Sequence, residues 1–370
     1  ERRRSSGISD SLSCEERNLM KEISIKAERM YKVLIGAETI SAVVDFAKER
    51  EKVAVIFSQS MKDRIPKFVA GDSEFFYFEI PDGEAGKSAA TLHKVWDWLG
   101  ASGFTRSDAI VAIGGGAVTD FAGFAAASWL RGIEWLAIPT TVAGMVDAAI
   151  GGKTGINSDY GKNLIGAFHS PTEVIIDFEW LATVSDRDFS AGLAEVVKCG
   201  FIQDPYILQL VKKNSLKEIR ANRGLTEELV ERAIAVKAQV VSGDFREGFD
   251  REILNYGHTF GHAVELHCKY SMRHGECVAI GMIFIAYLSQ ELGLLSSEHV
   301  ALHEEILQAL NLPSRYQDGD FPQLLAAMRR DKKSRGNNMR FVVITDLGKT
   351  QRLENPSEGA LLKAYEKICQ

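Results

Sequence analysis

The sequence predicts an α/β domain followed by an α-helical domain. From about residue 52 to residue 178, short β-rich runs alternate with helical stretches, which is typical of a mostly parallel sheet covered by helices. From about residue 187 onward, nearly every segment has helical spacing of its apolar residues. The length of 370 residues suits two domains of usual size. We therefore expect a polar segment at 1–20, an α/β domain at 21–185 and a helical domain at 186–370.

Five runs in the first half have the composition of buried strands. In chain order they are KVAVIFS (52–58), FFYFEIP (75–81), DAIVAIGGG (108–116), EWLAIP (134–139) and EVIIDF (173–178). In the second half, TEELVERAIAVKAQVV (226–241) places Leu229, Ala233 and Val236 at helical spacing, with charged residues between them. One late strand, RFVVIT (340–345), is expected among the helices.

Charge and cysteine content exclude several classes of protein. The formal net charge of −6 argues against a general nucleic-acid surface, because phosphate binding leaves a strongly basic footprint. Any basic cluster should therefore be local. Five cysteines without a CxxC pair suggest free thiols in a reducing cytoplasm.

The apolar run 277–288 is too short to span a bilayer, so we expect a buried helix and no membrane partner. Residues 1–20 are polar and expected to be disordered or tag-like.

An apolar strand runs directly into three glycines and then into a helix of small residues. Gly114, Gly115 and Gly116 stand at this strand-to-helix turn. Glycines there let backbone amides approach a ligand, and a helix N-terminus attracts anions, so a pyrophosphate fits this place. A purely structural turn is the alternative, because the spacing differs from the usual GxGxxG fingerprint. Asp120 is either a first-turn charge favoured by the helix dipole or a cofactor contact.

The next segment, IPTTVAGMVDAAIGGKTGINSDYGKN (138–163), collects polar side chains on a glycine-rich loop. The candidates in it are Thr140, Thr141, Asp147, Lys153, Lys162 and Asn163. Cationic side chains on such a loop, beside a nucleotide site, are suited to receive a phosphorylated or carboxylated substrate. The alternative is a solvated surface loop.

Four of the eight histidines fall within one stretch, NYGHTFGHAVELHCKYSMRHGE. His258 and His262 are four residues apart, the spacing of HExxH zinc sites, and His274 follows a polar break. This clustering favours a metal or acid–base site over a core histidine. A carboxylate is the expected further ligand, and Glu195 is the candidate. Glu195 lies three residues before Lys198 on an amphipathic helix, so a surface ion pair is the alternative reading of these two residues.

Together these motifs resemble those of the 3-dehydroquinate synthase family, within the sugar-phosphate cyclase superfamily. The resemblance runs, in the family's order, from PDGEAGKS through GGGAVTDFAGFAAA, VDAAIGGKTG, GKNLIGAFH, AGLAEVVK, LNYGHTFGHA and RHGE to RDKKSRGNNMRFVVI. It implies a Rossmann-like NAD-binding α/β domain, an all-α C-terminal domain and an active site between them. This agrees with the two patterns found along the chain.

The resemblance also implies the cofactor sites. It matches Glu195, His258 and His274 to the family's zinc ligands and places His262 against the substrate phosphate, which overrides the spacing argument. The expected cofactors are therefore NAD and a divalent metal, zinc or else cobalt. The implied NAD contacts are Glu84, Lys87, Gly114, Gly115, Gly116, Asp120, Thr140, Thr141, Lys162 and Thr183. Ser58 and Gln59 stand where many nucleotide-binding folds place an acid for the adenosine ribose.

By the same resemblance, the substrate is the sugar-acid phosphate 3-deoxy-D-arabino-heptulosonate 7-phosphate. The implied reaction is a transient oxidation by NAD, phosphate elimination, reduction and an aldol cyclisation to 3-dehydroquinate. The implied substrate-binding residues are Asp147, Lys153, Asn163, Lys198, Lys237, Arg251, Asn255, His262 and Lys332, which is followed by Lys333. Arg131 is expected to reach the neighbouring subunit's site in a homodimer.

Three alternatives stay open at this point. Other sugar-phosphate cyclases share the NAD and zinc framework but accept substrates without a carboxylate, whereas Lys237 and Arg251 here are both basic. A metal-dependent glycerol or alcohol dehydrogenase would release NADH and would need fewer phosphate and carboxylate receivers. A catalytically inactive relative would bind NAD or metal for regulation or assembly.

Overall fold

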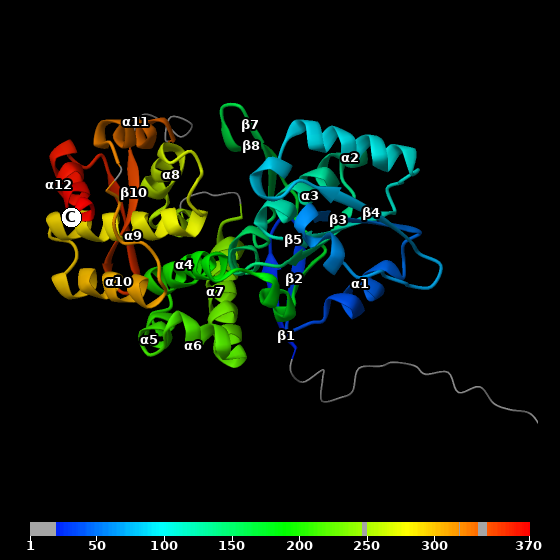
Figure 1. Ribbon diagram of the computed structural model, residues 1–370, viewed down its shortest axis with the longest axis horizontal. Coiled ribbons are helices and arrows are strands. Elements are labelled where there is room, and N and C mark those ends of the chain that lie inside the picture. The colour runs from blue at the N-terminus through cyan, green and yellow to red at the C-terminus, as the bar shows by residue number, and fades with distance from the viewer. Residues whose placement is uncertain (1–19, 246–249, 318, 332–338) are drawn as a thin grey trace, which may run out of the picture.

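The computed structural model places an α/β half beside a helical half (Figure 1). It describes residues 20–245, 250–317, 319–331 and 339–370. The predicted substrate residue Lys332 and positions 1–19 of the predicted polar segment lie outside the described residues. The predicted domain boundary near 185 falls where a 3₁₀ helix, η6 (Phe178–Thr183), gives way to α4 (Asp186–Ile202). Among the described residues, no helix has the length and apolar character needed to cross a membrane.

The first half is built on a seven-stranded sheet. The strands are β1 (Lys21–Lys26), β2 (Met30–Ile35), β3 (Lys52–Ser58), β4 (Glu74–Ile80), β5 (Ala109–Gly114), β6 (Glu134–Pro139) and β9 (Glu173–Ile176). They lie in the order β1–β2–β9–β6–β5–β3–β4, and only the edge pair β1–β2 is antiparallel. All five predicted strand runs lie in this sheet. In a mostly parallel sheet, the loops that follow the strands lie together at the carboxyl ends of the strands, and ligands bind there.

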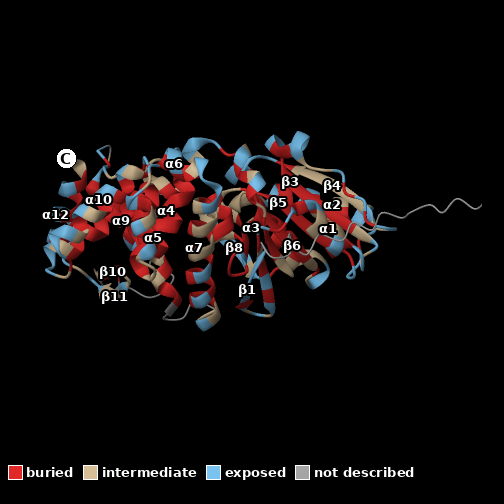
Figure 2. Ribbon diagram, turned by 90° about the horizontal axis from the view of Figure 1, so that it is seen from below, coloured by how far each residue is buried: buried red, intermediate tan, exposed pale blue. Residues whose placement is uncertain are grey.

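Helices cover both faces of the sheet, as the continuous apolar runs of its strands require. Val53, Val55 and Phe57 of β3 pack in the core under α1 (Thr39–Ala47). Ala54 and Ile56, which point to the opposite face, pack in the core shared with α2 (Ala89–Ala101) and α3 (Gly116–Ser128). This second core continues into the helical half, where it includes residues of α4, and Figure 2 shows buried segments in both halves.

The glycine-rich segment after β6 is not the continuous loop that we expected. A π-helix, η5 (Gly144–Ala148), is followed by an antiparallel hairpin of β7 (Lys153–Ser158) and β8 (Gly161–Phe168). Glycine suits this hairpin because the backbones approach closely: a Cβ on Gly166 would lie 2.1 Å from the carbonyl oxygen of Thr154. The strands were missed because exposed residues dominate β8, which leaves no alternating apolar pattern to recognise.

The second half is helical, as expected. Besides α4, its helices are α5 (Tyr206–Lys212), α6 (Leu216–Ala221), α7 (Arg223–Gly243), α8 (His258–His267), α9 (His274–Glu291), α10 (Ser297–Ala309), α11 (Phe321–Asp331) and α12 (Glu358–Cys369). The predicted late strand is β10 (Arg340–Asp346), and it forms a hairpin with β11 (Lys349–Glu354), which we did not predict. The apolar run 277–288 is a buried helix as expected, because it lies in α9, which packs against α4, α8, α10 and α12.

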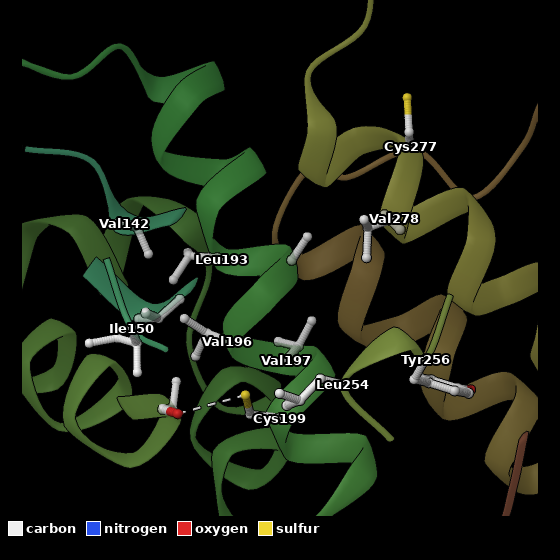
Figure 3. Packing of buried hydrophobic residues seen from close by; sticks show 14 of the residues in the cluster. Val142, Ile150, Leu193, Val196, Val197, Cys199, Leu254, Tyr256, Cys277 and Val278 are labelled. Carbon is white, nitrogen blue, oxygen red and sulfur yellow. Dashed lines mark hydrogen bonds between the residues drawn. The ribbon is translucent and has the colours of Figure 1, made fainter. Parts of the chain in front are cut away.

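Two glycines of α9 let its neighbours approach closely. A Cβ on Gly275 would lie 1.7 Å from the carbonyl oxygen of Ala191 on α4, and one on Gly281 would lie 1.9 Å from the carbonyl oxygen of Gly257. Only glycine fits at such distances. Figure 3 shows the result: the side chains of α4 lie between Val142, from the α/β half, and Val278 of α9. Helix α4 is therefore buried by both halves of the chain.

A buried histidine completes the core of the helical half. His303 of α10 stacks on Phe201, with the ring centroids 3.7 Å apart. Its Nδ1 lies 2.7 Å from the carbonyl oxygen of His299, and its Nε2 lies 2.8 Å from the hydroxyl of Tyr256. Burial lowers the pKa of His303 to about 4, because the charged imidazolium would lose its hydration.

His303 should make the stability of the protein fall in mild acid. Between pH 6.5 and about 4, the unfolded chain binds a proton at this histidine that the folded chain does not. The free energy of unfolding should therefore fall as the pH drops through this window, by at most about 3 kcal/mol from this group. Urea unfolding of the wild type and of His303→Gln, measured from pH 8 to pH 4, should give a shallower fall for the variant. Parallel curves would contradict the assignment.

Candidate active site

The glycine turn joins β5 to α3 at the edge of the sheet where ligands are expected. Gly115 is the N-cap of α3, and no side chain there makes a capping hydrogen bond. A Cβ on Gly116 would lie 2.9 Å from the Cβ of Ala148, so glycine lets the turn pack closely on η5. The helix end is therefore not capped by its own side chain, and its amide groups and dipole favour an anion.

Thr140 and Thr141 lie next to this turn, directly after β6. The amide of Thr140 donates to the carbonyl oxygen of Gly114 at 2.9 Å. The hydroxyl of Thr141 accepts a hydrogen bond from the amide of Gly144 at 3.1 Å. The predicted NAD contacts on the ends of β5 and β6 therefore lie together, because parallel pairing aligns Gly114 with Pro139.

Charged residues from three segments meet beside the turn. Lys87, which follows the 3₁₀ helix η3 (Gly83–Gly86), is buried, and its Nζ lies 2.7 Å from Oδ2 of Asp120 on α3. Lys87 also donates to the amide oxygen of Asn163 on β8. Lys162 Nζ lies 3.7 Å from Oε1 of Glu84. Burial raises the pKa of Asp120, although the charge of Lys87 opposes this shift. The hairpin thus brings two predicted site residues to the nucleotide side of the sheet.

The three predicted metal ligands come together from α4, α8 and α9. His274 Nε2 lies 3.3 Å, and His258 Nε2 3.7 Å, from the same oxygen of Glu195, Oε1. One potential ligand atom from each residue lies within 4.8 Å of the other two. Glu195 is 1% exposed, and neither of its carboxylate oxygens makes a hydrogen bond of regular geometry. A catalytic zinc site commonly has two imidazoles and a carboxylate as its protein ligands. A buried carboxylate without hydrogen bonds also calls for a partner, so these residues fit a divalent metal.

Lys198 compensates part of the buried negative charge. It lies one helical turn after Glu195 on α4, is 2% exposed, and forms an ion pair with Oε2 of Glu195. Burial alone would raise the pKa of Glu195, but the charge of Lys198 holds it well below its usual value. The alternative reading of these two residues as a surface ion pair was wrong, because α4 is buried on all sides and no solvent reaches the pair.

A second group of charges links η5 to the helical half. Lys237 of α7 forms an ion pair with Asp147 of η5. Arg251, on the 3₁₀ helix η7 (Asp250–Asn255), is 2% exposed and lies against Gly151, where a Cβ would meet a guanidinium nitrogen at 2.4 Å. Burial opposes ionisation of Asp147, but Lys237 holds the pKa of this carboxyl below its usual value. Cations from α4 and α7, Lys198 and Lys237, therefore lie around one aspartate, and Arg251 of η7 acts on Lys237.

The spacing of His258 and His262 suggests two ligands on one helix face, and in the structure the two histidines share one partner but differ in the carboxylate beside them. His262 is grouped with Glu265 and His274, while His258 is grouped with Glu195 and His274. The rings of His258 and His262 are 5.4 Å apart between centroids. Burial raises the pKa of Glu265, but the hydrogen bond with His274 and the charge of Lys162 lower it to about 2. His262 therefore lies at the edge of the candidate metal site and faces the Glu265 side of it.

Several predicted residues are placed less directly. Lys153 begins β7 and is exposed, and Asn255 ends η7 and is half-buried. The hydroxyl of Thr183 donates to the carbonyl oxygen of Trp180 within η6, at 2.7 Å. Arg131 lies on the 3₁₀ helix η4 (Trp129–Arg131), beyond the C-terminal end of α3. The length of α3 puts Arg131 about 20 Å from the glycine turn of its own chain.

Three residues of this region were not predicted from the sequence. Glu265 is two helical turns after His258, and this spacing could have revealed it. Asn157 donates to Glu84 at 2.6 Å and accepts a hydrogen bond from the amide of Asn163 at 3.0 Å, across the hairpin turn. Asp82, after β4, accepts a hydrogen bond from the hydroxyl of Ser60 at 2.6 Å. It thus supplies a carboxylate near the end of β3, where the sequence shows only Ser58 and Gln59.

The chain matches a known family along most of its length. The 3-dehydroquinate synthase N-terminal model matches residues 77–191, and the 3-dehydroquinate synthase C-terminal model matches residues 192–334. The 3-dehydroquinate synthase of Corynebacterium glutamicum (strain R) is 45% identical over 356 residues, which cover 94% of this chain and 97% of the relative.

Solved structures of related enzymes share the fold. ValA (2-epi-5-epi-valiolone synthase) from Streptomyces hygroscopicus subsp. jinggangensis 5008, with NAD⁺ and Zn²⁺ bound, is 25% identical with a TM-score of 0.86, covering 94% of this chain and 98% of that chain. A 2-deoxy-scyllo-inosose synthase complexed with carbaglucose-6-phosphate, NAD⁺ and Co²⁺ is 24% identical with a TM-score of 0.84, covering 94% and 99%. These likenesses confirm the predicted two-part fold. From the family models and the relative, the chain belongs to the 3-dehydroquinate synthase family.

Proposed function

We propose that the chain converts 3-deoxy-D-arabino-heptulosonate 7-phosphate to 3-dehydroquinate and phosphate. The observation that carries this proposal is the convergence of a metal-type donor set with buried cations from α4 and α7. Glu195, His258 and His274 supply the donors. Lys198 lies beside these donors, and Lys237 reaches Asp147 from α7. A substrate with a phosphate, a carboxylate and an alcohol to be oxidised needs such a combination.

NAD is the redox cofactor of this proposal, and its pyrophosphate would lie at the glycine turn. The uncapped N-terminus of α3 and the small residues around Gly116 support this placement. Lys87, Asp120 and Lys162 would line the site from the side of η3 and the hairpin. When bound, NAD supplies a hydride acceptor that is restored within each turnover. The chain's task is to hold it beside the metal and to exclude water.

A divalent metal would be held by Glu195, His258 and His274. Zinc is proposed first and cobalt second, because the related ValA structure has Zn²⁺ bound. When bound, the metal supplies a Lewis acid that favours loss of the alcohol proton and polarises the resulting ketone. The carboxylate of Glu195 would lower the net charge of the centre, and a set of three protein donors would leave one position for a substrate oxygen.

The chain's own residues would then bind and orient the substrate anions. Arg251 and Lys237 would receive the carboxylate, because a guanidinium binds carboxylates in a fixed geometry. Lys198, Asn255 and His262 would contact the rest of the polar substrate. The eliminated phosphate is itself a base beside the acidified C–H, so few dedicated acid–base side chains are required. Positioning and electrostatics therefore provide most of the rate enhancement.

Phosphate release is expected to be catalytic in NAD. The assay would use excess substrate and an NAD concentration below the concentration of active sites. Many phosphate ions should then be released per NAD molecule, because the cofactor is restored in each cycle. Treatment with a chelator should stop release, and zinc should restore it. The measurement is a phosphate assay together with NADH absorbance. Stoichiometric NADH formation from glycerol or another polyol, without phosphate release, would instead identify a dehydrogenase.

The metal assignment predicts that Glu195→Gln binds metal weakly while it keeps its size. Loss of the carboxylate leaves two imidazole donors, so metal content after dialysis and phosphate release should both fall by more than about 10-fold. The matched control is Glu252→Gln, since Glu252 is also a buried acid of the helical half but pairs with Arg352. Full metal occupancy in Glu195→Gln, measured by elemental analysis, would refute the ligand assignment.

We also propose that the chain works as a homodimer in which Arg131 serves the neighbouring subunit. Arg131 is exposed, and both it and Leu130 have positive φ angles, 70° and 48°. Such angles are unfavourable for these residues, which is typical of functional positions. Tyr160 and Leu164 of the hairpin region are 94% and 63% exposed, so apolar surface is available for association.

The cytoplasmic location stays a prediction, supported by the free thiols of Cys199 and the other described cysteines.

Subunit mixing tests whether Arg131 acts across the dimer. Arg131→Ala and Glu195→Gln should each be nearly inactive alone. Mixed dimers contain one site with an intact metal centre and an intact arginine from the partner, so random assortment should restore about a quarter of wild-type phosphate release. Arg106→Ala, at another exposed arginine, is the control and should remain active by itself. No recovery on mixing, with dimers verified by light scattering, would contradict the shared site.

A further inference from the structure

Each candidate histidine ligand has a separate acceptor for its second ring nitrogen. The Nε2 atoms of His258 and His274 both face Oε1 of Glu195. On the other side of the rings, His258 Nδ1 lies 3.1 Å from the carbonyl oxygen of Tyr256, and His274 Nδ1 lies 3.3 Å from Oε1 of Glu265. A neutral imidazole has one donor and one acceptor nitrogen, so an acceptor at Nδ1 fixes the lone pair at Nε2.

Glu265 is held rigidly in place for this contact. It is 5% exposed and lies on α8, two helical turns after His258. Helix α8 therefore carries one candidate metal ligand, His258, and also the residue that accepts a hydrogen bond from a second candidate ligand, His274. Lys162 of β8 approaches the same oxygen, Oε1, at 3.4 Å and balances the charge of the carboxylate. Lys162 Nζ also lies 4.3 Å from the centre of the Tyr270 ring, which fixes the ammonium group.

We propose that Glu265 is a positioning residue of the metal centre, which accepts a hydrogen bond from the Nδ1–H group of His274 and so keeps the Nε2 lone pair of His274 free to bind metal. The inference rests on the metal centre of the proposed function. His274 needs this acceptor more than His258 does, because its side chain is 38% exposed, against 11% for His258. Without Glu265, water would compete for Nδ1 and the ring would be free to turn away from Glu195.

Metal binding to the full-length protein separates this role from a structural one. Metal-free wild type, Glu265→Ala, Glu265→Gln and the control Glu252→Gln would be titrated with Co²⁺, following the visible absorption of the bound ion. Glu265→Ala should bind Co²⁺ about 10- to 100-fold more weakly. Glu265→Gln should lie between Glu265→Ala and the wild type, because its amide oxygen still accepts a hydrogen bond from Nδ1. The control should match the wild type.

Thermal unfolding of the metal-free proteins shows whether a variant is folded. If Glu265→Ala does not fold, the comparison of Glu265→Gln with Glu252→Gln decides, and weaker Co²⁺ binding by the former supports the proposal. Equal Co²⁺ affinity and equal absorption spectra in the wild type and a folded Glu265 variant would overturn the inference while leaving the metal centre intact. A wild type that binds no Co²⁺ would overturn the metal centre and, with it, this inference.

Discussion

The buried carboxylate of Glu195 is the constraint on which the rest of the site depends. A carboxylate that is 1% exposed loses its hydration, and the effective cost is several kcal/mol unless opposite charges and hydrogen bonds replace the water. Lys198 provides one positive charge, and the imidazoles of His258 and His274 face the other side. The arrangement of α4, α8 and α9 is therefore best explained by a cation between these donors, because the carboxylate oxygens otherwise lack regular hydrogen bonds.

Close helix packing holds the donors at these distances. Gly275 follows His274 directly and lies against the backbone of Ala191, so α9 begins close to α4. Gly281, two turns later, lies against the backbone of Gly257, which immediately precedes His258. These two contacts place both histidines relative to Glu195 through backbone atoms alone. These two glycines thus determine the geometry of the candidate metal site, although in the sequence they look like ordinary helix breakers.

The fold was largely predictable because apolar patterns are local, whereas the site depends on contacts between distant segments. The strands β3, β4 and β5, which lie between residues 52 and 114, were recognised from composition alone. The spacing of His258 and His262 indicates a shared helix face but not which partners approach that face: His258 is grouped with Glu195 and His274, and His262 with Glu265 and His274. The sequence spacing can show that Glu265 shares a helix face with His258, but the role of Glu265 depends on α9 and β8, which approach it only in the folded chain. The β7–β8 hairpin was missed because exposed strands lack an apolar pattern.

The distribution of charge explains how an acidic chain can bind an anionic substrate. Lys198, Lys237 and Arg251 are each at most 7% exposed. Lys198 and Lys237 act on Asp147, and Arg251 acts on Lys237, so buried positive charge is gathered in one place while the chain as a whole carries −6. In water these side chains would attract any anion, but buried cations attract mainly an anion that can enter and replace their present partners. Lys237 now pairs with Asp147 across the two halves. A substrate carboxylate that competes for Lys237 would therefore bind at the contact that joins the α/β half to the helical half.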